Sequence, residues 1–130
     1  MNLPDQIEDA IVAHARFCFP EEACGLVAAD ADGRLRMAYC LTNADASSHR
    51  FTVDADEHFG ALRHAERNGW RITGSFHSHP TSEPLPSRAD VAGALDPEWI
   101  HLIAGPVEPG PIRIEAFRVA NGEARPVTTP

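Results

Sequence analysis

Lysine is absent from this 130-residue chain, whose eleven basic residues are all Arg against nineteen Asp and Glu, giving a formal net charge of -8. Nucleic-acid binding depends on basic patches that displace counterions from phosphates, so this balance argues against a nucleic-acid partner. Long apolar runs are also missing, as is a basic start followed by an apolar stretch, so we expect no membrane partner. The sequence predicts a cytoplasmic protein.

Cysteine is scarce as well, with Cys18, Cys24 and Cys40 odd in number and without the paired spacing of a structural zinc site or a redox motif. Reduced thiols in a cytosolic protein are the expected state. The length predicts one domain over residues 1–130, large enough to bury about two-thirds of the surface of its unfolded chain.

Periodicity and turn residues predict an α/β domain of two or three layers, with a mixed sheet and flanking helices. The expected helices cover residues 4–18, a segment that opens at Asp54 and ends before Gly69, and residues 87–95. The expected strands cover residues 23–29, 34–41, 50–53, 70–77, 99–104 and 112–119, the first two forming a hairpin, and the last residues of the chain are expected to fray.

The most informative motif is His77-Ser78-His79, followed by Ser87 and Asp90. Residues two apart on a strand point to the same face, so the two imidazoles can converge on one ion. Zinc accepts His nitrogen and Asp oxygen, and three protein ligands leave a fourth position for water, which is the catalytic arrangement. The spacing therefore predicts a catalytic zinc site.

A structural interpretation of Asp90 also exists, because Ser87 and Asp90 have the spacing of a helix-opening capping box. A cap alone does not explain two histidines at strand spacing just upstream. The two roles are compatible, since Ser87 can cap the helix while Asp90, within the first turn, faces the metal.

Hydrolysis at such a site needs a group that takes the proton of water, and a carboxylate is the usual choice. Glu21 and Glu22 both stand at the entrance to the first expected strand. Either could be a solvated surface residue, and the local pattern does not choose between them.

Glu22 before Ala-Cys-Gly, together with His-Ser-His, seven residues, Ser, two residues and Asp, resembles the JAMM (MPN+) family of zinc metallopeptidases over nearly the whole chain. The resemblance implies a cytidine-deaminase-like α/β sandwich. It further implies that His77, His79 and Asp90 bind zinc, that Glu22 is the general acid/base, and that Ser87 helps to stabilise the tetrahedral intermediate.

The short format is similar to that of bacterial members of the family that process sulfur carriers. This likeness implies hydrolysis of the amide after the C-terminal glycine of a small ubiquitin-like sulfur-carrier protein, with release of cysteine. We expect the extended tail of the carrier to bind along an exposed strand edge beside the site.

Three other functions compete with this prediction. A zinc deaminase would fit the His64-Ala65-Glu66 segment, but the downstream Pro-Cys-x-x-Cys of that class is absent. A non-catalytic binding module would not need the intact ligand set. An isopeptidase that removes a ubiquitin-like protein from lysine remains open, because the motif does not distinguish it from a cysteine-releasing peptidase.

Overall fold

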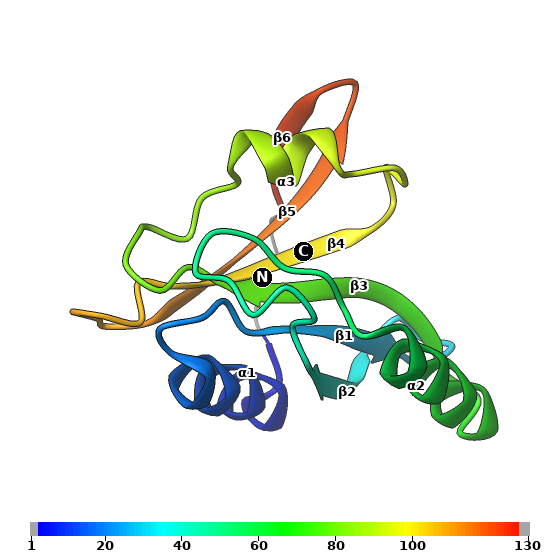
Figure 1. The fold of residues 1–130 in the computed structure, drawn as a ribbon. Coiled ribbons are helices and arrows are strands. Elements are labelled where there is room, and N and C mark those ends of the chain that lie inside the picture. Colours follow the sequence, from blue (N-terminus) through cyan, green and yellow to red (C-terminus); the bar gives the residue numbers. More distant parts are fainter. Residues whose placement is uncertain (1–2, 128–130) are drawn as a thin grey trace.

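The chain folds around one six-stranded mixed sheet, as the computed structural model shows for residues 3–127 (Figure 1). No helix in this range is long and apolar enough to cross a membrane. In chain order the elements are α1 (Asp5–Cys18), β1 (Cys24–Ala29), β2 (Leu35–Leu41), α2 (Ala55–Arg67), β3 (Arg71–Ser78), α3 (Arg88–Ala92), β4 (Ile100–Gly105), β5 (Arg113–Ala120) and β6 (Glu123–Pro126).

The strand order is β2-β1-β3-β4-β5-β6, in which only β3 and β4 are parallel neighbours. α1 buries Ile7 and Ile11 against one face of the sheet, in a cluster with Phe76 and Leu102. α2 packs Ala61 against the other face. The result is a three-layer α/β domain, which confirms the predicted fold class.

The central pairing joins β1 and β3 as antiparallel neighbours, with Cys24 opposite His77 and Gly25 opposite Phe76. Two hydrogen bonds extend the pairing beyond β1: the Ser78 N–H donates to the Ala23 carbonyl at 3.0 Å, and the Ala23 N–H donates to Ser78 Oγ at 2.7 Å. This register brings the residues just before β1 to the carboxyl end of β3.

Most expected elements are confirmed, including the Asp54 cap, whose carboxylate accepts from the Glu57 N–H. The predicted strand over 50–53 is wrong: only a single bridge joins Asn43 and Val53 there. The Asn43 side chain replaces the ladder, since its Oδ1 accepts from the Thr52 N–H at 3.1 Å and its Nδ2 donates to the Arg50 carbonyl at 3.0 Å.

Two further expectations, for the third helix and for the C-terminal residues, also differ from the structure. α3 stops at Ala92 instead of residue 95, because Gly93 caps it. The expected fraying is wrong for residues 123–126, which form β6, while residues 128–130 lie outside the described part of the chain. Asn121 and Gly122 both have positive φ, as a two-residue turn between antiparallel strands requires, and this Asn-Gly pair is the signal for the missed hairpin.

Two glycines test this packing in opposite directions. A Cβ on Gly25 would collide with the Tyr39 carbonyl oxygen and the Phe76 ring, whereas a Cβ on Gly60, inside α2, would meet nothing. We expect Gly25→Ala to lower the free energy of unfolding by about 1–3 kcal/mol. Gly60→Ala should raise it by about 0.5–1 kcal/mol, because alanine loses less backbone entropy in a helix. Denaturant unfolding measures both, and a neutral Gly25→Ala would contradict the β1–β3 packing.

Candidate metal centre and cavity

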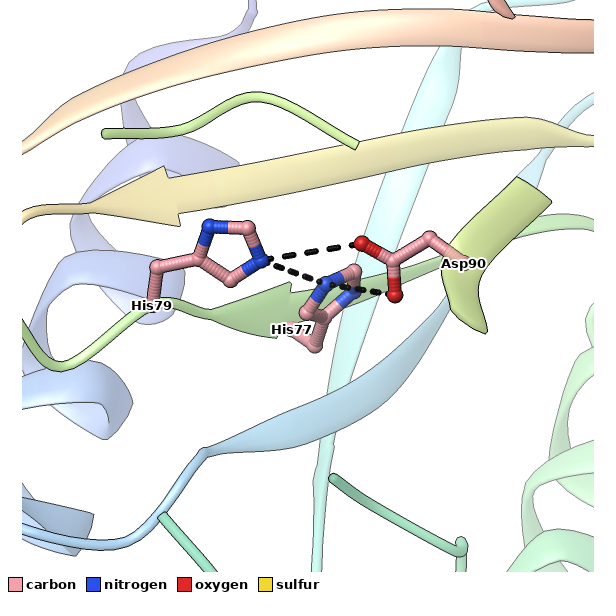
Figure 2. A group of neighbouring side chains, drawn as sticks. All are labelled: His77, His79 and Asp90. Carbon is pink, nitrogen blue, oxygen red and sulfur yellow. Dashed lines mark hydrogen bonds and ion pairs between the residues drawn. The ribbon is translucent and has the colours of Figure 1, made fainter. Parts of the chain in front are cut away.

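The fold brings together the side chains of His77, His79 and Asp90 (Figure 2). The two Nε2 atoms are 3.2 Å apart. Asp90 Oδ1 lies 3.4 Å from His77 Nε2, and Asp90 Oδ2 lies 3.6 Å from His79 Nε2. His77 comes from the end of β3, His79 from the residue just after that strand, and the carboxylate from α3.

These separations fit the edges of a metal tetrahedron. Donors at about 2.0–2.2 Å from a tetrahedral zinc ion are about 3.3–3.5 Å from one another. The two nitrogens lie 3.2 Å apart, and each is 3.4–3.6 Å from a different oxygen of Asp90, so these nearest separations are close to that range. Two imidazole nitrogens and one carboxylate oxygen are also a donor set that zinc accepts, so this group could hold a metal ion.

The tautomer of His79 is set by the loop that follows β3. His79 Nδ1 lies 2.7 Å from the Glu83 carbonyl oxygen, which can only accept, so Nδ1 carries the hydrogen and donates. In a neutral ring, this leaves the Nε2 lone pair directed at the three-donor group. The His77 ring is fixed differently, by stacking on Phe51 with ring centroids 4.7 Å apart.

Asp90 caps α3 and also faces the two histidines. Its Oδ2 accepts from the Ser87 N–H at 2.8 Å while Ser87 Oγ accepts from the Asp90 N–H at 3.1 Å, which completes the capping box of α3. Burial alone would raise the pKa of Asp90, but hydrogen bonds from His77 and His79 hold that pKa well below its usual range. The carboxylate is thus ionised and fixed in direction before any ligand binds.

The electrostatics of the group favour a positive charge between the three donors. Desolvation acts to lower the pKa of His79, but the Asp90 carboxylate and the Glu83 carbonyl together raise it above its ordinary value. In the metal-free protein this position therefore attracts a proton, and a divalent cation would meet the same stabilising field.

Glu22 is buried, with 6% of its surface exposed, whereas Glu21 is exposed. Both backbone polar groups of Glu22 are hydrogen-bonded. The Glu22 N–H donates to the Ser47 carbonyl at 2.8 Å, and the Glu22 carbonyl accepts from Asn43 Nδ2 at 3.0 Å. Desolvation raises the pKa of Glu22 to about 7, with His79 lowering it and Asp90 raising it by smaller amounts. A carboxyl group with this pKa can both take and return a proton near neutral pH.

A cavity of about 530 Å³ connects these groups. Glu22, His77 and Asp90 line it, whereas His79 lies outside the lining, as does Ser87, which is exposed at the start of α3. Residues that the sequence reasoning did not select also line it: His49, Arg50, Phe51, Ser75, Ala89, Gly93, Leu95, Asp96, Trp99 and His101.

Part of this lining could have been found from the strand pattern. Ser75 precedes His77 by two residues and so shares its face, and His101 on β4 is paired with Ser75. Trp99 joins them, since its Nε1 donates to Ser75 Oγ at 2.9 Å. Arg50 and Phe51 lie in an irregular segment, where periodicity gives no indication of direction.

In this α/β domain, two histidines at the end of a central strand and a carboxylate from a short helix form a group that could hold a metal ion. The family described as prokaryotic homologs of the JAB domain matches residues 4–120, and the chain belongs to this family. This membership confirms the resemblance to JAMM/MPN proteins.

Similar proteins support the same assignment. A desampylase of Haloferax volcanii is 33% identical over 82% of this chain and 81% of its own length. A CysO-cysteine peptidase of Mycobacterium tuberculosis is 30% identical over 88% of this chain and 79% of its own length. A Desulfitobacterium hafniense protein of known solution structure superposes with a TM-score of 0.86 at 33% identity, covering 96% of this chain and 88% of that one.

The metal centre leads to a first prediction about the site. His77→Ala should remove about one zinc per chain, because the remaining pair is a poor chelate for an ion that prefers three protein ligands here. Metal analysis of the dialysed protein measures this loss. His58→Ala, which removes a histidine on α2, is the matched control, and undiminished zinc in His77→Ala would contradict the assignment.

Burial of Glu22 predicts a pH-dependent stability in the chelator-treated protein. Its pKa of about 7 exceeds the 4.5 of a free glutamate, so the stabilisation from the bound proton is complete below about pH 4.5 and is lost as the pH rises through 7. Glu22→Gln lacks this loss. Relative to the wild type it should therefore gain on the order of 3 kcal/mol between pH 4.5 and pH 8.

Denaturant unfolding at the two pH values measures this gain, with Glu21→Gln as the control for removal of a neighbouring exposed carboxylate. A Glu22→Gln offset that is the same at both pH values would show that the Glu22 carboxyl is not desolvated.

Proposed function

We propose that this chain is a zinc metallopeptidase in which His77, His79 and Asp90 hold the metal. The observation that carries the proposal is the convergence of His77 Nε2, His79 Nε2 and the Asp90 carboxylate, whose nearest atoms lie 3.2–3.6 Å apart. When bound, zinc would supply Lewis acidity, polarising the scissile carbonyl and acidifying water.

Glu22 is the proposed general acid/base. It lines the same cavity as His77 and Asp90, and burial raises its pKa to about 7, which matches proton transfer at neutral pH. Glu22 takes a proton from the attacking water and later delivers it to the leaving amine. Its backbone is fixed by Ser47 and Asn43 at the edge of the cavity, which lowers the entropic cost of placing the carboxyl group.

Ser87 is the proposed donor to the developing oxyanion. Its oxygen already accepts from the Asp90 N–H, and this leaves its own hydrogen free to donate outward. Loss of one such donor typically costs about 10² to 10³ in rate. Because Ser87 is exposed, a bound substrate would have to cover it for the hydrogen bond to reach full strength.

The proposed substrate is a small ubiquitin-like sulfur-carrier protein, cleaved after its C-terminal glycine with release of cysteine. The names of the two relatives, a CysO-cysteine peptidase and a desampylase, support hydrolysis at the C-terminus of a small ubiquitin-like protein. The proposed location is the cytoplasm, where free thiols such as Cys18, Cys24 and Cys40 stay reduced.

The expected strand edge for the tail is not provided by the strands that carry the site. β1 is paired with β2 and β3, and β3 with β1 and β4, so the described sheet has its edges at β2 and β6. A bound tail must instead follow the irregular segments that border the cavity, such as the one containing Arg50 and Phe51.

The second candidate is an isopeptidase that releases a ubiquitin-like protein from lysine, which the same reaction centre would serve. The deaminase alternative loses the histidine of its His64-Ala65-Glu66 segment, since His64 Nδ1 on α2 lies 2.8 Å from the Tyr39 hydroxyl and His64 is not part of the three-donor group. A purely binding function would leave the buried Glu22 carboxyl beside the donors without a purpose.

Hydrolysis by variants at the two neighbouring glutamates tests the mechanism. Glu22→Gln should retain zinc and lose about 10² to 10⁴ in rate on a cysteine-adducted carrier, because Gln cannot move a proton. Glu21→Gln, changed at an exposed position, should remain active. An active, zinc-loaded Glu22→Gln enzyme would transfer the role to another group.

The substrate is tested in the same assay by mass spectrometry. A carrier ending in a cysteine adduct is compared with a carrier linked to a lysine side chain, each incubated with zinc-loaded wild-type protein. We expect loss of cysteine from the first and little cleavage of the second. Cleavage of the lysine conjugate alone would favour the isopeptidase and leave the site assignment unchanged.

A further inference from the structure

Arg50 is the one arginine among the described residues that line the cavity, in a chain that has no lysine. Three carboxylates, those of Glu22, Asp90 and Asp96, line the same cavity. Apart from the position between His77, His79 and Asp90, where a metal cation would sit, the guanidinium is the one fixed positive charge of the described lining that an anionic group would meet there. Arg50 is therefore the feature of the cavity that distinguishes an anionic ligand from a neutral one.

The backbone of Arg50 is anchored beside the reaction centre. Asn43, which is 8% exposed, donates from Nδ2 to the carbonyl oxygens of both Glu22 and Arg50 at 3.0 Å. The next residue, Phe51, stacks on the His77 ring. One buried amide thus fixes Arg50 relative to Glu22, and one ring contact fixes its neighbour relative to the three-donor group.

The guanidinium of Arg50 is largely uncommitted. Within the described chain its one charged partner is Asp45, with Nε 3.8 Å from Oδ2, which is too long for a hydrogen bond. The same Asp45 oxygen accepts from Thr52 Oγ1 at 2.7 Å, so it is already engaged. With 75% of the Arg50 side chain exposed, its N–H donors are free for a ligand, and their planar fork matches a carboxylate.

We propose that Arg50 binds the free α-carboxylate of the residue released from the carrier. The inference rests on the proposed peptidase function and narrows it to substrates whose leaving residue is the last of the chain. A cavity of about 530 Å³ has room for one such residue together with the end of the tail. A lysine within a folded protein brings no carboxylate to this place, so Arg50 selects terminal adducts over isopeptides.

Binding to a catalytically silent protein tests the proposal without relying on turnover. Zinc-loaded Glu22→Gln is titrated with a synthetic carrier-tail peptide ending in Gly-Gly-Cys, made once with a free carboxylate and once as the C-terminal amide. We expect the acid to bind about tenfold or more tightly than the amide, as a charge-assisted bidentate contact would give.

In the Glu22→Gln background, a second change of Arg50→Gln should remove this preference by lowering the affinity for the acid alone. Arg50→Lys should keep only part of the preference, because an ammonium group lacks the planar pair of N–H donors. Arg67→Gln, which removes the same charge from the end of α2 that precedes β3, is the matched control and should leave the preference intact. A purely structural role of Arg50 would change the affinities for the acid and the amide alike, so a loss of affinity for the acid alone identifies direct recognition of the carboxylate.

Two results would overturn the proposal: equal binding of acid and amide, or an Arg50→Gln variant that weakens both equally. The second result would show that Arg50 contacts a part of the peptide that the acid and the amide share. Hydrolysis of the acid peptide by wild-type protein is measured in parallel. If no hydrolysis occurs while the Arg50-dependent preference persists, the proposed reaction fails and the carboxylate site stands.

Discussion

The register between β1 and β3 is the constraint on which the site depends. With Cys24 opposite His77, and with Ser78 and Ala23 joined by two hydrogen bonds, the chain just before β1 reaches the carboxyl end of β3. Side chains alternate between the faces of a sheet, so a slip of one residue would send the partners to opposite faces. The close packing of Gly25 against Phe76 opposes such a slip. The contact that fills the core therefore also fixes the register that assembles the site.

Asp90 shows how a local structural rule can prepare a chemical group. The capping box fixes its carboxylate at the start of α3, and the same carboxylate lies across from the two histidines. α3 has five residues and no buried side chain, so few packing contacts hold it in place. Bridging three donors with a cation would therefore stabilise α3 over the cavity as well as complete the centre, because ligand binding stabilises the state that binds it.

The grouping of His77, His79 and Asp90 could be predicted from sequence because their spacing has a local meaning: two residues on a strand, and a capping box at a helix start. The resemblance to the family chose Glu22 over Glu21. The local pattern could not make that choice, since the burial of one and the exposure of the other depend on long-range pairing. Arg50 and Phe51 were beyond local reasoning for the same reason: Asn43 and His77 fix their segment from elsewhere in the chain. The strand β6 could have been predicted from the Asn121-Gly122 pair, which is typical of a hairpin turn.

X-ray absorption at the zinc edge of the zinc-loaded protein tests most directly whether this centre holds the metal. The account predicts a first shell of nitrogen and oxygen alone at about 2.0–2.2 Å, with the outer-shell scattering of two imidazole rings. Cys18, Cys24 and Cys40 are all free thiols that could compete for zinc. A sulfur scatterer at about 2.3 Å would contradict the account, because it would place the metal on cysteine and away from His77, His79 and Asp90.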